Sequence, residues 1–179
     1  NSQVERCNEI LKRLTLNPVE EDEFIDKDIN LRDYLSEIIS SFKEISKKEF
    51  IFNFDQDSNP KKISKSIEIV YGLRNFIGNA NKFAKNSIFI NLKSDSEFTE
   101  LTIEDDGNGY PRDIISKIGE PYLKSNYSKD KSKEGLGLGL FIGKTLLEKN
   151  FASVNCRNSK TRNGAEVVIR WKNKELFNI

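Results

Sequence analysis

The stretch Leu73–Phe83 constrains the fold of this chain more than any other, because its two faces need different surroundings. At helical spacing its apolar residues form one broad stripe, the pattern of a helix packed against a sheet. Asn75, Asn79 and Lys82 lie one turn apart on a different face. Two carboxamide oxygens and an ammonium in a row suit a ligand that carries a hard cation and phosphates. A solvated helix edge in an Asn- and Lys-rich chain is the alternative interpretation.

Composition excludes several classes of protein. The chain has 179 residues, of which 36% are hydrophobic and 32% charged, and this fits one ordinary domain. Its 29 basic and 28 acidic residues nearly cancel, so it has no basic field of the kind that nucleic-acid binders use. No apolar run is long enough to span a bilayer, and no signal-peptide pattern opens the sequence. With no histidine and with Cys7 far from Cys156, a structural zinc site is excluded.

The order of elements predicts an α+β fold. Helices are expected at residues 1–16, 31–48 and 64–84, and from the glycine-rich segment 135–140 to about residue 150. Strands are expected at residues 50–54, 88–92, 98–104, 152–157 and 165–171, with a short edge strand at 24–25. The strands are half apolar, as in a sheet with one face against helices. We therefore expect a two-layer sandwich, in which three helices cover one face of a mixed, mostly antiparallel sheet.

Asn30 is expected to cap the helix at residues 31–48. Its buried face is predicted to consist of six apolar residues, namely Leu31, Leu35, Ile38, Ile39, Phe42 and Ile45.

A glycine-rich turn follows the strand at residues 98–104. Asp105 comes directly after that strand, and Gly107 and Gly109 let the backbone turn sharply and approach a ligand closely. A carboxylate fixed there accepts a hydrogen bond from an exocyclic amine such as that of adenine. A simple turn that uses Asp and Gly for positive φ angles is the alternative.

A second glycine-rich segment opens the helix that ends near residue 150. Gly135, Gly137 and Gly139 stand where exposed N–H groups and the positive end of the helix dipole receive phosphate oxygens. Glycine is a poor helix former, so three glycines at a helix start need a reason. The long polar segment between Gly119 and Glu134 is rich in lysine and is predicted to be a lid over a polyphosphate.

At these residues the chain resembles the catalytic, ATP-binding domain of bacterial sensor histidine kinases. This family lies within the superfamily of gyrase, the Hsp90 chaperones and MutL, whose fold is the Bergerat fold. Four sequence boxes occur in the family's order: the N box at 75–83, the G1 box at 105–111, the F box at 119–122 and the G2 box at 135–140. The F box carries Tyr122 where phenylalanine is commoner. Each box alone is weak, and the four together are specific.

The resemblance assigns roles to these residues. It implies that Asn79 is the principal Mg²⁺ ligand, with Asn75 beside the metal and phosphates. It also implies that Lys82 meets phosphate and that Asp105 binds the adenine amine. The residues assigned to ATP are Asn75, Asn79, Lys82, Phe83, Asp105, Gly107, Gly109, Tyr122, Lys124, Gly135, Leu136, Gly137, Leu138, Gly139 and Leu140.

The segments 119–122 and 4–11 resemble the RegB/PrrB redox-responsive class. In that class a cysteine near the end of the dimerisation helices is implicated in redox control, and Cys7 matches its place. A small apolar residue on a coiled-coil seam is the alternative for Cys7. The expected division is residues 1–17 as the end of a dimerisation helix with its linker, and residues 18–179 as the catalytic domain.

The resemblance implies a protein-histidine kinase domain that transfers the γ-phosphoryl of ATP to a histidine outside this sequence. A response regulator then takes the phosphoryl group. The implied partners are that regulator and the protein's own dimerisation domain, with no nucleic acid. The full-length protein is expected to be a membrane-attached homodimer of the bacterial inner membrane, with this domain in the cytoplasm.

Two other functions are weighed against this one. The gyrase and MutL branch hydrolyses ATP with a glutamate one turn before the metal-binding asparagine, where this chain has Asn75, which cannot act as a base. A nucleotide-dependent interaction module without phosphoryl transfer is the third possibility, and the four intact boxes argue against it.

Overall fold

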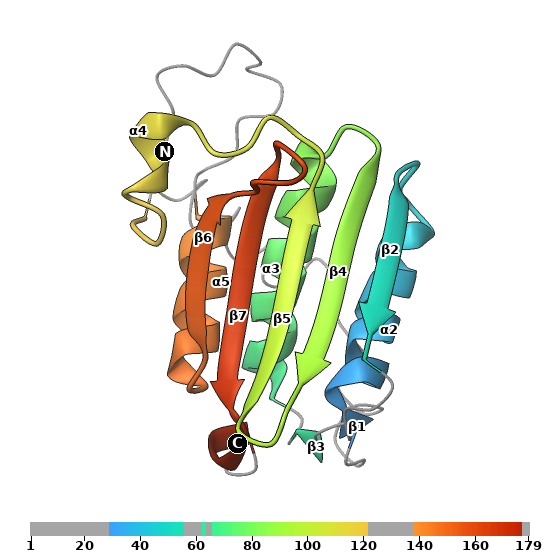
Figure 1. Ribbon diagram of the computed structural model, residues 1–179, viewed down its shortest axis with the longest axis vertical. Coiled ribbons are helices and arrows are strands. Elements are labelled where there is room, and N and C mark those ends of the chain that lie inside the picture. The colour runs from blue at the N-terminus through green and yellow to red at the C-terminus, as the bar shows by residue number, and fades with distance from the viewer. Residues whose placement is uncertain (1–28, 56–61, 64–65, 122–137, 177–179) are drawn as a thin grey trace, which may run out of the picture.

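Five strands form the main sheet, in the order β2-β4-β5-β7-β6 (Figure 1). The computed structural model describes residues 29–55, 62–63, 66–121 and 138–176. The strands are β2 (Glu49–Phe54), β4 (Ser87–Ser94), β5 (Phe98–Asp105), β6 (Ser153–Asn158) and β7 (Ala165–Lys172). β2 runs parallel to β4 and the other neighbours are antiparallel, so the sheet is mixed and mostly antiparallel, as predicted.

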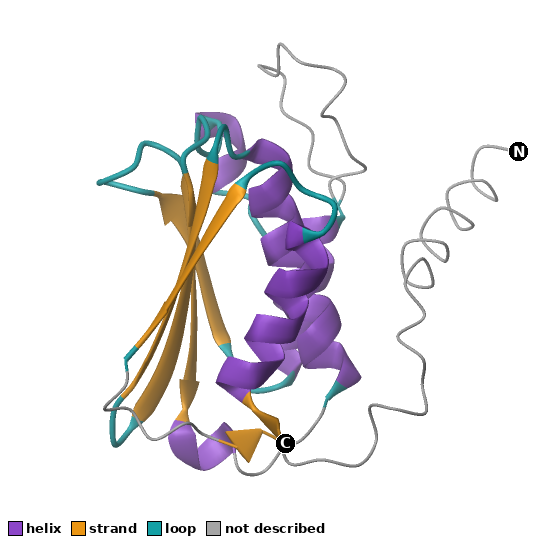
Figure 2. Ribbon diagram, turned by 90° about the vertical axis from the view of Figure 1, so that its right-hand side faces the viewer, coloured by secondary structure: helices purple, strands orange, loops and turns teal. Residues whose placement is uncertain are grey.

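Three helices cover one face of this sheet, and no described helix covers the other face, which is called the open face below (Figure 2). They are α2 (Leu31–Lys43), α3 (Ile67–Phe83) and α5 (Gly139–Lys149). Smaller elements are α4 (Arg112–Ile115), α6 (Asn173–Leu176) and the two-stranded ladder of β1 (Ile29–Asn30) with β3 (Lys62–Ile63). The predicted two-layer α+β sandwich is confirmed. None of the described helices has the length and apolar character to cross a membrane.

The alternation of side chains along β5 decides which residues reach the helix layer. Leu101 and Ile103 are buried against the helices, at 0% and 1% exposure. Successive strand residues point to opposite faces, so Asp105 also lies on the helix side, whereas Glu104 faces the open side. The last residue of β5 therefore brings a carboxylate into the interior.

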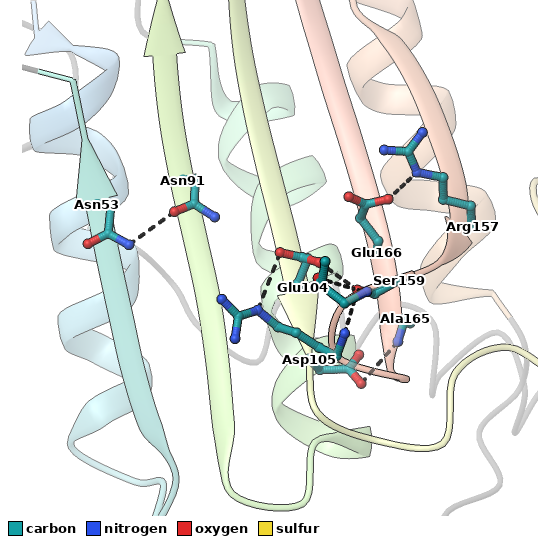
Figure 3. Close-up of polar contacts among 10 residues, drawn as sticks. Asn53, Asn91, Glu104, Asp105, Arg157, Ser159, Ala165 and Glu166 are labelled. Carbon is teal, nitrogen blue, oxygen red and sulfur yellow. Dashed lines mark hydrogen bonds and ion pairs between the residues drawn. The ribbon is translucent and has the colours of Figure 1, made fainter.

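Paired charges occupy part of the open face (Figure 3). Glu104 on β5 stands directly opposite Glu166 on β7. Two like charges in facing positions destabilise a sheet unless they are compensated. Arg162 lies 3.6 Å from Glu104, and Arg157 forms an ion pair with Glu166, so each carboxylate has its own cation.

The start of α2 agrees with the prediction. The Asn30 side chain accepts a hydrogen bond from the Asp33 N–H at 2.9 Å, which satisfies one of the donors that a helix start leaves free. The predicted apolar face is buried at four positions, which are Leu31, Leu35, Ile38 and Ile39. Phe42 is partly buried and packs against this core.

The end of α2 differs from the prediction, because the helix stops at Lys43 and not near Lys48. Ile45, predicted to be buried, is 79% exposed. From here the chain turns toward the end of α3, where the Ser46 hydroxyl donates to the Asn81 side-chain oxygen at 2.7 Å. The Lys48 ammonium donates to the Asn81 backbone carbonyl. The Ser46 N–H still bonds to the Phe42 carbonyl at 2.9 Å, whereas the Lys48 N–H bonds to the Ser46 hydroxyl at 3.1 Å and not to a helical carbonyl.

One end of the sheet gathers the segments that the sequence singled out. α3 ends, α5 begins and β5 ends at the same side, the upper end in Figure 1. The candidate site is built there.

Candidate functional site

Asn75 lies where α3 meets the start of α5. Its amide nitrogen donates to the Tyr71 carbonyl one turn earlier, at 2.8 Å, and no described residue donates a hydrogen bond to its amide oxygen. A Cβ on Gly139 would lie 3.5 Å from that oxygen, and one on Gly143 would lie 3.2 Å from the Asn75 Cβ. Because glycine occupies both positions, α5 begins directly beside the Asn75 amide.

Asn79 and Lys82 extend the polar row toward the end of α3. Asn79 is half-buried, and within the described part of the chain its amide has no hydrogen-bond partner. Lys82 is exposed, with its ammonium 5.3 Å from the centre of the Phe83 ring. Amide oxygens are ligands that a hard cation prefers.

The first turn of α5 offers backbone donors beside this row. The residue before the helix is Leu138, whose side chain forms no capping hydrogen bond. The first helical bond runs from the Ile142 N–H to the Leu138 carbonyl at 2.8 Å, so the N–H groups of residues 139–141 precede it. Uncapped N–H groups at the positive end of a helix dipole form an anion site, and Gly139 and Leu140 belong to this turn.

The Asp105 side chain is almost completely buried, and the residue is 2% exposed. Its Oδ1 accepts hydrogen bonds from the Gly107 N–H at 2.8 Å and from the Ala165 N–H at 3.2 Å. Burial raises the pKa of Asp105 above its ordinary value, against the opposing effect of these hydrogen bonds. Among the described residues Oδ2 has no hydrogen-bond partner, so this oxygen remains to accept from a ligand.

Gly107 joins the Asp105 turn to the end of α3. A Cβ at position 107 would lie 2.4 Å from the Phe83 carbonyl oxygen and 2.7 Å from Asp105 Oδ1. Such contacts are impossible, so only glycine lets the turn and the helix end lie this close. Phe83 itself is 42% exposed at this end of the sheet. The structure thus brings the N box and the G1 box together.

The turn between β6 and β7 supplies a wall of the site that sequence reasoning missed. A Cβ on Gly164 would lie 1.8 Å from the Asp105 carbonyl oxygen, so this glycine packs flat against the strand end. Asn163, the residue before it, has a φ of 61°. The Asn163-Gly164 pair is typical of a tight turn. That the turn packs against Asp105 follows only from the sheet order, in which β7 lies beside β5.

The remaining predicted residues divide into two groups. Gly109 is described and has a φ of +72°, the left-handed conformation that its turn required. The others lie outside the described residues, and they are Cys7, Tyr122, Lys124, Gly135, Leu136 and Gly137.

Comparison with known proteins places this geometry in a family. The family described as histidine kinase-, DNA gyrase B-, and HSP90-like ATPase matches residues 64–175. Sensor histidine kinase RegB of Cereibacter sphaeroides is 37% identical over 108 residues, which are 58% of this chain and 23% of RegB. The chain thus spans about a quarter of the length of this curated relative.

Solved structures show the same fold. The mycobacterial sensor histidine kinase MprB superposes with a TM-score of 0.68 at 19% identity, covering 80% of this chain and 96% of that one. The catalytic domain of histidine kinase ThkA superposes with a TM-score of 0.66 at 21% identity, covering 80% and 95%. The family expected from the four boxes is therefore confirmed. The chain belongs to the family of histidine kinase-, DNA gyrase B- and HSP90-like ATPases, and its fold is that of a sensor histidine kinase catalytic domain.

Proposed function

We propose that this chain is the ATP-binding catalytic domain of a two-component sensor histidine kinase. In this proposal the full-length protein transfers the γ-phosphoryl of ATP to a histidine and then to a response regulator. The observation that carries it is that the Asp105 turn packs against the end of α3, the helix whose Asn75 lies beside the start of α5. The 179 residues contain no histidine, so the acceptor lies outside them.

Asp105 supports recognition of adenine over guanine. The carboxylate is held by two backbone N–H groups on one oxygen, which fixes its orientation before any ligand arrives. The other oxygen then accepts from the exocyclic amine of adenine. Guanine has a carbonyl at the corresponding position. Its oxygen and the Asp105 carboxylate oxygen are both hydrogen-bond acceptors and would repel each other.

Asn75, Asn79, Lys82 and the first turn of α5 support binding of the phosphates. Neutral amide oxygens at Asn79 and Asn75 would ligate Mg²⁺ without adding negative charge beside the phosphates. When bound, Mg²⁺ neutralises charge on the phosphate oxygens. Lys82 and the N–H groups of residues 139–141 orient and neutralise the phosphoryl group that is transferred. Phosphoryl transfer needs mostly this positioning and neutralisation.

Asn75 also argues against wasteful hydrolysis. Its amide donates to the Tyr71 carbonyl and has no basic atom that could take a proton from water. Water at this point would therefore lack a general base, and ATP would be kept for the histidine acceptor. This favours the kinase over the hydrolytic branch of the same family.

The rest of the protein is proposed from the resemblance to RegB. Residues 1–17 would be the end of a dimerisation helix with its linker, and residues 18–179 the catalytic domain. The partners would be the protein's own dimerisation domain and a response regulator, in a homodimer attached to the bacterial inner membrane. Cys7 would be the redox-responsive residue of this class.

Two measurements test the assignment. In calorimetric titration the chain should bind ATP analogues with Mg²⁺ far more tightly than the guanine counterparts, and equal affinities would refute the role of Asp105. With γ-labelled ATP, the chain alone should take up no label. A histidine-bearing helical domain from the same full-length protein, added to the mixture, should become labelled. Acid-resistant label on the chain itself would indicate a serine or threonine kinase.

Asn79 variants test the metal site. Asn79→Ala removes a ligand oxygen and Asn79→Asp adds a negative charge beside the phosphates, so both should abolish transfer to the added domain. The melting temperature of the unliganded protein should change little, because Asn79 makes no hydrogen bond within the described residues. Asn155→Ala, which removes an exposed amide from the open face of β6, is the matched control. Normal transfer by either Asn79 variant would move the metal away from α3.

A further inference from the structure

The β6–β7 hairpin, from Asn158 at the end of β6 to Ala165 at the start of β7, contacts both ends of the glycine segment that runs from Asp105 to Tyr110. At the first end, the Ala165 N–H donates to Asp105 and Gly164 packs against the same residue. At the second end, the Asn158 side chain holds the backbone of Tyr110. Residues of one hairpin therefore hold both the start and the end of the segment.

Asn158 binds the Tyr110 backbone with both halves of its amide. Its Oδ1 accepts from the Tyr110 N–H at 2.6 Å, and its Nδ2 donates to the Tyr110 carbonyl at 3.0 Å. An aspartate would keep the first bond and lose the second, and an alanine would lose both. The pair is thus specific for an amide side chain at this position.

Gly109 is fitted to this contact. Its φ of +72° suits glycine, and a Cβ there would lie 2.7 Å from Asn158 Oδ1. Without the Asn158 clamp, a segment with two glycines has wide conformational freedom, which ligand binding would have to remove. The Tyr110 side chain is 8% exposed, so the clamped residue is also anchored in the core.

We propose that Asn158 is a positioning residue for the adenine end of the nucleotide site. It fixes the backbone of Gly109 and Tyr110, and through them the segment that carries Asp105, without touching the nucleotide itself. This inference rests on the proposed function, since it assumes that Asp105 receives adenine. Its consequence is that the loss of Asn158 weakens nucleotide binding and adenine selectivity more than it weakens the fold.

The test compares the full 179-residue chain with Asn158→Ala, Asn158→Asp and the control Asn155→Ala. Binding of a non-hydrolysable ATP analogue and of its guanine counterpart is measured by calorimetry. We expect Asn158→Ala to weaken the ATP analogue about tenfold, which corresponds to about 1.4 kcal/mol, with a smaller preference over guanine. Asn158→Asp should fall between Asn158→Ala and wild type, and Asn155→Ala should bind normally.

A readout without nucleotide separates positioning from a general structural role. In Asn158→Ala, amide hydrogen exchange should become faster at Gly107, whose N–H donates to Asp105. The amides of strands β4 and β5 should keep their wild-type protection. Wild-type affinity and selectivity in Asn158→Ala would overturn the inference and leave the proposed function intact. Loss of affinity only in proportion to global unfolding would also overturn it. Failure of the wild-type chain to bind any adenine nucleotide would overturn the proposed function and this inference together.

Discussion

Gly72 on α3 and Leu147 on α5 are in contact so close that a Cβ on the glycine would lie 2.7 Å from the leucine Cγ. Leu147 is fully buried, so its side chain has no free space to move into. Together with Gly143, which approaches Phe76 closely, this contact sets the separation of the two helices that carry the proposed phosphate-binding residues.

Gly72→Ala should therefore destabilise the domain by about 1–3 kcal/mol, because overpacking forces the buried leucine from its position. Gly78→Ala in the same helix is the matched control. Among the described residues a Cβ there meets only the Phe42 ring, at 3.4 Å, and alanine favours the helix by up to about 1 kcal/mol. Chemical denaturation measures both, and equal stability of the two variants would contradict the packing argument.

The backbone at Phe151 should favour glycine over alanine. It follows α5 in the left-handed conformation, with a φ of 61°, and its ring is 56% exposed. The Phe151 N–H bonds to the Glu148 carbonyl at 3.1 Å, and the Ala152 N–H bonds to the Leu147 carbonyl at 3.0 Å. This is the helix-ending motif in which glycine is the usual residue.

We expect Phe151→Gly to be about 1 kcal/mol more stable than Phe151→Ala, since only glycine adopts this conformation without steric cost. Both variants lose the ring, so their difference isolates the backbone term. Thermal unfolding at one pH is sufficient. An alanine variant as stable as the glycine variant would show that the backbone at position 151 carries no strain.

Nucleotide affinity should fall on acidification through Asp105. Burial raises the pKa of Asp105, with a further increase from Asp106, while the hydrogen bonds from Gly107 and Ala165 and the charge of Lys48 lower it. The ionised carboxylate accepts a hydrogen bond from the adenine amine with either oxygen. Protonation of the carboxyl group places a hydrogen on one oxygen and weakens this acceptor. The affinity for ATP should therefore begin to fall at a pH above the ordinary value of 3.8.

Asp105→Asn provides the control for this pH dependence. Its affinity should be about 10–100-fold lower at neutral pH, because a charged hydrogen bond is lost, and independent of pH across the same window. The folded-state pKa of Asp105 lies above the unfolded value, so ionisation of the carboxylate costs stability as the pH rises. The asparagine variant should thus be no less stable than wild type at pH 7. A clear loss of stability would contradict this reading.

The Cys156 thiol should be nearly inert in the folded protein. Burial raises its pKa from 9.0 to about 11, although a hydrogen bond with Tyr110 opposes the shift. At pH 8 the thiolate fraction is then about 100-fold smaller than in the unfolded chain. Alkylation by iodoacetamide in a Cys7→Ser background measures the difference, and comparable rates with and without denaturant would refute it.

The same shift makes a prediction about stability. The folded-state pKa of Cys156 lies above the unfolded value, so its stabilising effect is complete below pH 9 and is lost as the pH rises toward about 11. Cys156→Ser should show a weaker loss over this range.

Local patterns predicted the strands and the polar face of α3 well, because each depends on residues that are neighbours in sequence. The alternation around Leu101 and Ile103 placed Asp105 at a strand end. Helical spacing likewise placed Asn75 and Asn79 on one face. These features need no knowledge of the tertiary partners.

Tertiary contacts account for what the sequence did not predict. Ile45 continued the apolar spacing of α2, but the helix ends before it. The Ser46 and Lys48 side chains, which follow, bond to Asn81, which is far away in the sequence. Asn158 contacts Tyr110, which is 48 residues earlier in the sequence, and Gly164 contacts Asp105, which is 59 residues earlier, and the only sequence pattern around them is that of a turn. The short strands β1 and β3 have too few residues to show a period.

The place of β7 between β5 and β6 has a consequence for folding during synthesis. β7 is the last of the five strands to leave the ribosome, yet it completes the centre of the sheet and delivers the Ala165 N–H to Asp105. Until residue 172 has emerged, β5 presents an unpaired edge, because its partners in β7 lie between 62 residues (Glu104 and Glu166) and 74 residues (Phe98 and Lys172) downstream. Nascent chains of this domain should therefore remain partly folded and prone to aggregation until β7 has been synthesised.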